Sequence, residues 1–196
     1  TAFGTAGTGG FGFKNDSFAS FSPYIQWVVT IFMILFGVNF NAYFLLLTRK
    51  FKQLFKIEEI RVYLGVIAVF TTLIAFNVRG CFGSLRESFH HSLFQVASII
   101  TTTGFSTVDF NQWPAFSKLL LVLLMFIGAC AGSTGGGMKC SRILLLFKGV
   151  KKEMMSLIHP RLVRVHKMDG QRVQHEVMRS VNAFLVAYLI VIATSV

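Results

Sequence analysis

The chain is dominated by long apolar runs that are separated by short polar or basic segments. A helix needs roughly 20 apolar residues to cross about 30 Å of hydrocarbon. Runs of that length occupy residues 24–47 and 62–82, a shorter run covers 116–127, and a further run begins at Val181. Of the 196 residues, 54% are hydrophobic and only 14% are charged. The pattern therefore predicts an all-α membrane protein with several spanning helices, embedded in a lipid bilayer.

The basic residues are concentrated in two of the connecting segments. Of the 19 Lys and Arg, five lie in residues 48–61 and ten lie in residues 139–179. Connections rich in Lys and Arg stay on the cytoplasmic side of a membrane. We therefore expect both segments to be cytoplasmic, and we attribute the net charge of +11 to orientation in the membrane, with no nucleic-acid partner.

A short Thr/Gly/Phe motif occurs twice, at residues 8–11 and 102–105. Each copy is followed by a polar stretch and then by an apolar run. The apolar residues 92–100, which lead into the second copy, are too few to span and favour a segment that enters the membrane and returns. The repeated unit is predicted to be helix, pore loop, helix.

The two motifs have the residue types that a dehydrated cation needs. Backbone carbonyl oxygens can replace the hydration shell of K⁺ without fixed negative charge, and glycine adopts the left-handed conformations that turn carbonyls toward one axis. Threonine adds a hydroxyl, and a neighbouring Phe would pack the loop against helices. The alternative is an ordinary turn at a helix end. The candidate filter residues are Thr8, Gly9, Gly10, Phe11, Thr102, Thr103, Gly104 and Phe105, with K⁺ at the Thr and Gly positions.

A Gly-rich run interrupts the third apolar segment at the depth of the membrane. Non-helical backbone is tolerated there only when it is buried in protein or lines a watery cavity, so we predict a movable constriction, with a kinked helix as the alternative. A phosphate-binding loop would need Gly-Lys-Ser/Thr after a strand, whereas Lys139 precedes Cys140. The candidate gating residues are Gly128, Gly132, Ser133, Thr134, Gly135, Gly136, Gly137 and Lys139.

These motifs, together with the sequence from Phe126 to Lys139 and Asn111-Gln-Trp-Pro114, resemble the Trk/Ktr/HKT superfamily, and within it the Trk-type potassium uptake subunits. The resemblance implies four helix–pore loop–helix repeats around one pore, in a homodimer in the cell membrane. It implies K⁺ as the transported ion, no cofactor in this chain, and a cytoplasmic nucleotide-binding regulatory subunit as partner. By position, Gly10 and Gly104 correspond to filter glycines, and residues 128–137 to the intramembrane gate.

We expect the chain to be a fragment of a longer protein. The resemblance also implies how its residues divide into repeats and cytoplasmic segments. Residues 1–47 would hold the second pore loop and its outgoing helix, 48–61 a cytoplasmic loop, and 62–147 a complete third repeat. Residues 148–180 would be cytoplasmic, and 181–196 would begin the fourth repeat. A Na⁺ or Na⁺/H⁺-coupled secondary transporter is the alternative, but it predicts ionisable residues inside the spans. Residues 24–47 contain no Asp, Glu, Lys, Arg or His, and residues 116–137 contain one, Lys118, near the start of the run. No catalytic constellation indicates an enzyme.

Overall fold

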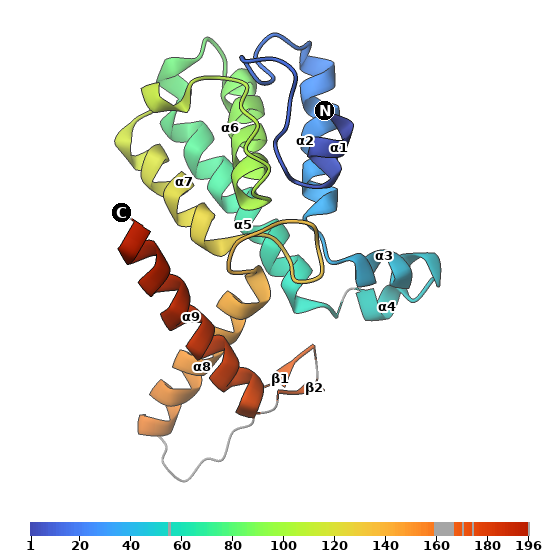
Figure 1. The fold of residues 1–196 in the computed structure, drawn as a ribbon, viewed down its shortest axis with the longest axis vertical. Helices are drawn as coiled ribbons and strands as arrows, with labels where there is room; N and C mark the ends of the chain where they lie inside the picture. The colour runs from blue at the N-terminus through green and yellow to red at the C-terminus, as the bar shows by residue number, and fades with distance from the viewer. Residues whose placement is uncertain (55, 159–166, 170, 174, 196) are drawn as a thin grey trace.

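The computed structural model describes residues 1–196 except 55, 159–166, 170, 174 and 196. Apart from one short hairpin, the described elements are helices (Figure 1). Four helices form the main bundle, and a short helix, α1 (Ala2–Ala6), lies beside the first of them. The four are α2 (Pro23–Phe36), α5 (Glu58–Asn77), α6 (Leu85–Ile100) and α7 (Ala115–Ile127). The all-helical membrane architecture predicted from the apolar runs is confirmed.

Helix α6 is the central element of this bundle and contacts α2, α5 and α7. Its residues from Phe94 to Ile100 are all buried, although three of them are polar or small. Tyr63, Ile67 and Ile74 of α5 contribute buried side chains to the same core. The outer faces of α2, α5 and α7 carry exposed Phe, Leu and Val side chains. A short helix enclosed by apolar outer helices is the arrangement expected of a segment held inside a membrane by its neighbours.

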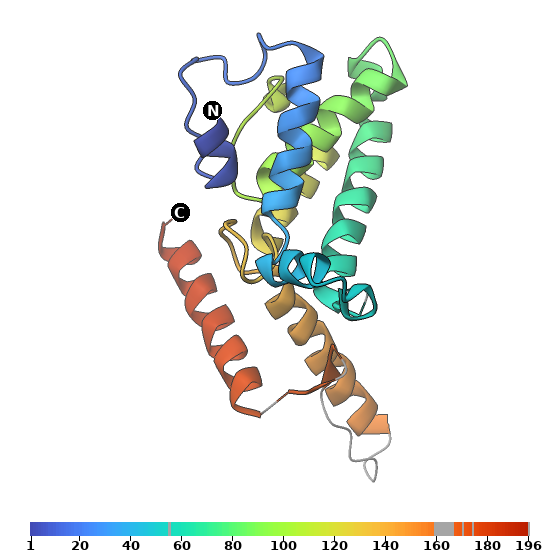
Figure 2. The ribbon, with the colours of Figure 1, turned by 90° about the vertical axis from the view of Figure 1, so that its right-hand side faces the viewer.

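The expectation of one continuous spanning helix over residues 24–47 is wrong. The run divides into α2 and α3 (Phe40–Leu47), and the two helix axes are bent by 92°. Figure 2 shows α3 running across the end of the main bundle, next to the four-residue helix α4 (Phe51–Leu54). The side chain of Asn39 caps α3 by accepting a hydrogen bond from the Asn41 N–H. The hydropathy of the sequence gives no sign of this bend, because both helices are apolar.

Within the described part of the chain, two helices are long and apolar enough to span a membrane by themselves, α5 and α9 (His175–Ser195). The run predicted over residues 62–82 begins earlier, at Glu58, and its helix ends at Asn77 before a short 3₁₀ turn, η1 (Arg79–Cys81). Helix α7 follows a second such turn, η2 (Phe110–Gln112), and has only 13 residues before the chain becomes irregular at Gly128.

Helix α8 (Cys140–Ile158) resumes after this irregular segment and packs against α9. Both extend away from the main bundle as an antiparallel pair (Figures 1 and 2). A two-stranded antiparallel hairpin, β1 (Lys167–Met168) and β2 (Gln171–Arg172), lies near the start of α9. The irregular segment 128–139, called here the Gly-rich loop, thus lies at the junction between the main bundle and the α8–α9 pair.

Candidate functional site

The two Thr/Gly/Phe motifs have the same backbone conformation. Thr8 and Thr102 adopt positive φ angles of 49° and 59°, and Gly10 and Gly104 adopt 68° and 84°. A left-handed conformation is uncommon for threonine and costs energy unless the surrounding structure holds it. Its occurrence at matching positions of both motifs indicates that the repeat seen in the sequence is a structural repeat.

The hydrogen bonds of the two loops match as well. In the first loop, the N–H groups of Gly9 and Gly10 both donate to the carbonyl of Gly4, at 3.0 and 3.4 Å. In the second, the N–H groups of Thr103 and Gly104 both donate to the carbonyl of Ser98, at 2.9 and 3.3 Å. Each loop therefore folds back over the C-terminal end of the helix that precedes it, α1 or α6.

The carbonyl oxygens of residues 8–10 and 102–104 are left free by this arrangement. Among the residues that the structure describes, no hydrogen-bond donor reaches these oxygens. Free main-chain oxygens near a helix C-terminus are suited to a cation, because the helix dipole also places partial negative charge there. The residues concerned are Thr8, Gly9, Gly10, Thr102, Thr103 and Gly104.

The structure brings the two loops into contact. A Cβ atom at Gly10 would lie 2.0 Å from the carbonyl oxygen of Thr103 and 3.7 Å from the Cα of Gly104. Gly10 is therefore required both by its positive φ and by the close approach of the second loop. A Cβ at Gly104 would meet nothing within 4 Å, so this side of the second loop borders open space in this chain.

The second loop is held more firmly than the first. Ser98 donates a hydrogen bond of 2.6 Å to the carbonyl of Phe105, whose ring is 1% exposed and packs 4.6 Å from that of Phe18. The expected role of a flanking Phe in fixing the loop is thus met by Phe105. Phe11, at the equivalent position, is 82% exposed, because no described segment covers it as Phe18 and Phe94 cover Phe105.

The Gly-rich loop lies directly against both motifs. The hydroxyl of Thr8 donates to the carbonyl of Thr134 at 2.9 Å, and the hydroxyl of Thr102 accepts from the N–H of Gly136 at 2.7 Å. The equivalent threonines of the repeat therefore both bind this loop, at residues two positions apart. The predicted filter and gate residues form one connected site.

Glycine is needed in this loop for backbone conformation and for close packing. Gly128, Gly132 and Gly137 have positive φ angles of 70°, 68° and 78°. A Cβ at Gly135 would lie 2.6 Å from that of Ala129. The side chain of Lys139 does not point away from the loop but donates its ammonium group back to the Gly135 carbonyl, so the predicted anchor is internal to the loop.

The bend between α2 and α3 is tied to the same loop. The N–H of Cys130 donates to the Gly37 carbonyl and the N–H of Phe40 donates to the Gly132 carbonyl, each at 3.0 Å. These bonds satisfy backbone groups that the break in the helix leaves unpaired. The end of α2 is therefore one wall of the site.

Glu59 is a residue of this site that the sequence does not reveal. It lies in the first turn of α5, is only 3% exposed, and accepts a hydrogen bond from Ala131 of the Gly-rich loop and another from Ser141 of α8. In the sequence it reads as one of two acidic residues at the start of an apolar helix, where Asp and Glu are common because they complement the helix dipole. Glu59 is in contact with the Gly-rich loop, which is distant in the sequence, so the local sequence does not indicate its burial.

The two carboxylates beyond the motifs have local roles. Asp109 caps η2 by accepting a hydrogen bond from the Asn111 N–H at 3.0 Å. Asp16 is fully exposed, and a hydrogen bond from Ser20 lowers its pKa, so the carboxylate is charged at neutral pH.

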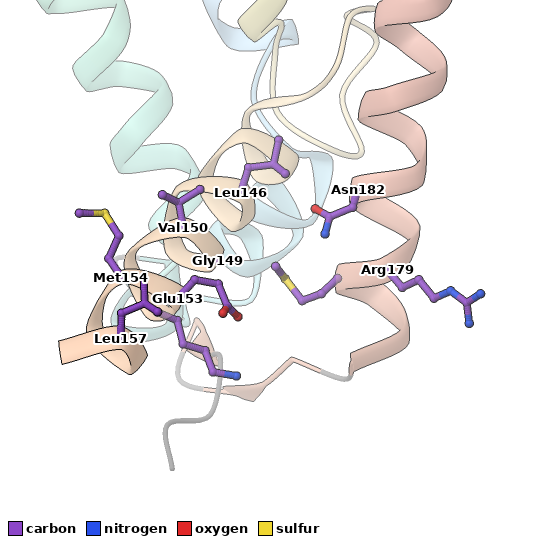
Figure 3. Close-up of a pocket in the computed structure, with 10 residues that line it drawn as sticks. Leu146, Gly149, Val150, Glu153, Met154, Leu157, Arg179 and Asn182 are labelled. Atoms are coloured by element: carbon purple, nitrogen blue, oxygen red, sulfur yellow. The ribbon is translucent and has the colours of Figure 1, made fainter. Parts of the chain in front are cut away.

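A cavity of about 510 Å³ lies apart from this site, between α8 and α9. Residues of α8 form most of its wall, and Asn182 points toward it from α9, whereas Arg179 extends away (Figure 3).

Repeated helix–loop–helix units, with a non-helical loop packed against the end of the main bundle, define a multi-pass membrane protein with pore loops. The whole chain, residues 1–196, matches the family model described as TrkH, cation transport protein, and the chain belongs to that family. It is thus a member of a transporter family and not an enzyme.

Relatives and a solved structure agree with this assignment. The chain is 36% identical to the Trk system potassium uptake protein TrkH of Escherichia coli K12, over 99% of this chain and 41% of that protein. It is also 36% identical to TrkG of the same organism, over 94% of this chain and 39% of that protein. The crystal structure of the potassium transporter TrkH from Vibrio parahaemolyticus superposes with a TM-score of 0.91 at 33% identity, covering 98% of this chain and 42% of that one. The chain thus spans about two fifths of the length of these relatives.

Proposed function

We propose that this chain forms part of a K⁺ conduction pathway across the cell membrane. The motif loops 8–11 and 102–105 are its selectivity filter, and the Gly-rich loop is its gate. The observation that carries the proposal is the contact between two loops that have positive φ angles at equivalent positions, and whose carbonyl oxygens at residues 8–10 and 102–104 accept no hydrogen bond from described residues.

The chemistry of these loops suits a monovalent ion in transit. Uncharged oxygens can replace the water of a K⁺ ion, yet they bind it weakly enough for the ion to leave. The C-terminal end of α6, with its partial negative charge, adds attraction without a carboxylate that would trap the ion. The names of the relatives, which are potassium uptake proteins and a potassium transporter, favour K⁺ over Na⁺. The ion is the cargo, and the chain needs no cofactor for this role.

The driving force is the membrane potential, which is worth about 2.3 kcal/mol per charge per 100 mV. The basic segments 48–61 and 139–179 orient the chain with these regions in the cytoplasm. The motif loops then open toward the outside, and an inside-negative potential draws K⁺ inward through them.

The Gly-rich loop restricts this flow from the cytoplasmic side of the filter. Its hydrogen bonds to Thr8 and Thr102 hold it against the residues whose oxygens the ion uses. Conduction requires these bonds to break and the loop to withdraw, which its glycines permit. Activation would come from a nucleotide-binding regulatory subunit that docks on residues 48–61 and 148–179, part of which lies outside the described residues. The complete protein would be a homodimer.

A Na⁺ or Na⁺/H⁺-coupled transporter is less well supported. Coupled transport needs an ionisable group that is free to bind the coupling ion. Among the described residues, Glu59 is the one buried carboxylate, and main-chain N–H groups already occupy its Oε1 atom.

Gly104→Ser in the complete protein tests the filter assignment. The substitution strains a position with φ of +84° and alters the free carbonyls beside it, so the permeability ratio of K⁺ to Na⁺ should fall. Reversal potentials of the reconstituted protein measure this ratio.

Gly12→Ser is the matched control. It introduces the residue that stands at the equivalent position of the second motif, Ser106, and a Cβ there would lie 4.0 Å from its nearest neighbour. Its ion preference should match that of the wild type. A Gly104→Ser protein that transports with unchanged preference for K⁺ would contradict the assignment.

A further inference from the structure

We propose that Glu59 is a positioning residue that holds the Gly-rich loop in its closed conformation. This inference rests on the proposed function, because it names the group that keeps the gate shut. It does not require Glu59 to bind the transported ion.

The geometry places one carboxylate oxygen where the two ends of the Gly-rich loop meet. This junction, formed by residues 129–131 and 140–141, is called here the neck of the loop. Oε1 of Glu59 accepts a hydrogen bond of 2.6 Å from the N–H of Ala131 and one of 3.0 Å from the N–H of Ser141. Ala131 lies near the start of the loop and Ser141 lies just after it, in the first turn of α8. A single side chain therefore joins the two ends of a segment of about ten residues that carries the gating glycines.

A further bond closes the same neck. The N–H of Cys140 donates to the Ala129 carbonyl at 2.9 Å. The main-chain bond alone would leave the neighbouring N–H groups of Ala131 and Ser141 without partners in a partly buried place, which is costly. Glu59 supplies the acceptor for both, and the N-terminal end of α8 favours its negative charge.

The closed conformation of the neck is lower in free energy than an open one, because of the hydrogen bonds to Glu59. A buried carboxylate is stable only when hydrogen-bond donors or a cation compensate for its lost hydration. Withdrawal of the loop would remove the Ala131 N–H and leave the charge with the Ser141 N–H of α8 as its one remaining donor of the two. The loop is therefore held at one position until another group or water replaces the bond from Ala131.

The helix turn that carries Glu59 is itself fixed. Glu58, one residue earlier, forms an ion pair with Lys148 of α8, and its N–H donates to Asp169 of the hairpin at 2.7 Å. The carboxylate of Glu59 is thus presented from a backbone that is anchored on its cytoplasmic side.

The inference is tested by measuring Rb⁺ flux into liposomes. The liposomes contain the complete protein without its activating subunit or ligand. Glu59→Ala removes two charge-assisted hydrogen bonds and should raise this basal flux about tenfold or more. Glu59→Gln keeps an acceptor oxygen but no charge, so its increase should be smaller. Glu87→Ala is the matched control, since Glu87 is an exposed acid in the first turn of α6, and it should leave the basal flux unchanged.

Thiol labelling gives a second measure of the neck in the same proteins. Cys130 and Cys140 lie in it and are buried, whereas Cys81 is exposed and is replaced by Ser for this assay. A membrane-permeant maleimide should label the neck cysteines faster in both Glu59 variants than in the wild type. If Glu59→Ala does not elute as a folded protein in size-exclusion chromatography, Glu59→Gln decides the outcome.

Two negative results are separable. If the wild-type protein passes no Rb⁺ even when fully activated, the proposed function fails. If the activated wild type conducts, while folded Glu59 variants show wild-type or lower basal flux and unchanged labelling, the function stands and the role of Glu59 is refuted.

Discussion

Replacement of Gly10 by Ala tests the meeting of the two motif loops more sharply than any other single change. Gly10 has a φ of +68°, and an added Cβ would lie 2.0 Å from the carbonyl oxygen of Thr103 and 3.2 Å from its carbonyl carbon. Both obstacles are main-chain atoms, so no side-chain rotation relieves them. The loops must separate by roughly 1 Å or more to restore an ordinary contact distance.

The expected cost has two parts. An L-residue in the left-handed region loses about 1–2 kcal/mol, and forced overpacking of a closely packed contact costs about 1–3 kcal/mol more. Gly10→Ala should therefore destabilise the folded protein by about 2–5 kcal/mol. Gly104→Ala shares the first cost, with φ of +84°, but a Cβ there meets nothing within 4 Å, so its cost should stay near 1–2 kcal/mol.

Thermal unfolding of the complete protein in detergent, followed by size-exclusion fluorescence, measures the difference. Gly10→Ala should lower the midpoint temperature clearly more than Gly104→Ala. Its K⁺ flux in liposomes should also be lost, because the two sets of carbonyl oxygens no longer approach each other. Equal midpoints for the two variants, or the greater loss for Gly104→Ala, would refute the contact between the loops.

Two further predictions concern the gate and the packing of the filter. Deletion of residues 135–137 should raise basal K⁺ flux in liposomes, because it removes the part of the loop that lies against Thr102 and Ala129; flux that stays low and still needs the activator would contradict the gate assignment. Phe105→Ala should lower the thermal stability of the complete protein by about 3–5 kcal/mol, the usual cost of emptying a buried aromatic site. Phe11→Ala, at the exposed equivalent position, should change the stability far less, and equal effects of the two substitutions would contradict the asymmetry between the loops.

The sequence was most informative where a residue type serves a backbone requirement. Glycine and threonine recur in the same order in the two motifs, and the left-handed conformations of Thr8, Thr102, Gly10 and Gly104 follow that order. The Gly-rich run was likewise detected as a place where a helix fails. Such signals are local, so a single sequence carries them.

Features that depend on contacts distant in the chain were not predictable. The bend between α2 and α3 lies within a continuous apolar run, and the groups that satisfy its free backbone come from Cys130 and Gly132, more than 90 residues later. Glu59 has the local sequence of an exposed acid, yet it is buried and accepts hydrogen bonds from the N–H groups of Ala131 and Ser141. The difference between Phe11 and Phe105 also arises from neighbours such as Phe18, which cover one of them.

The central claim is that main-chain oxygens of the two motif loops take the place of the hydration shell of K⁺. Anomalous diffraction from crystals of the complete protein grown in Rb⁺ tests it most directly. We predict an anomalous peak within coordination distance of the carbonyl oxygens of residues 8–10 and 102–104. Ordered loops without such a peak, with Rb⁺ bound instead at carboxylates elsewhere in the protein, would contradict the account.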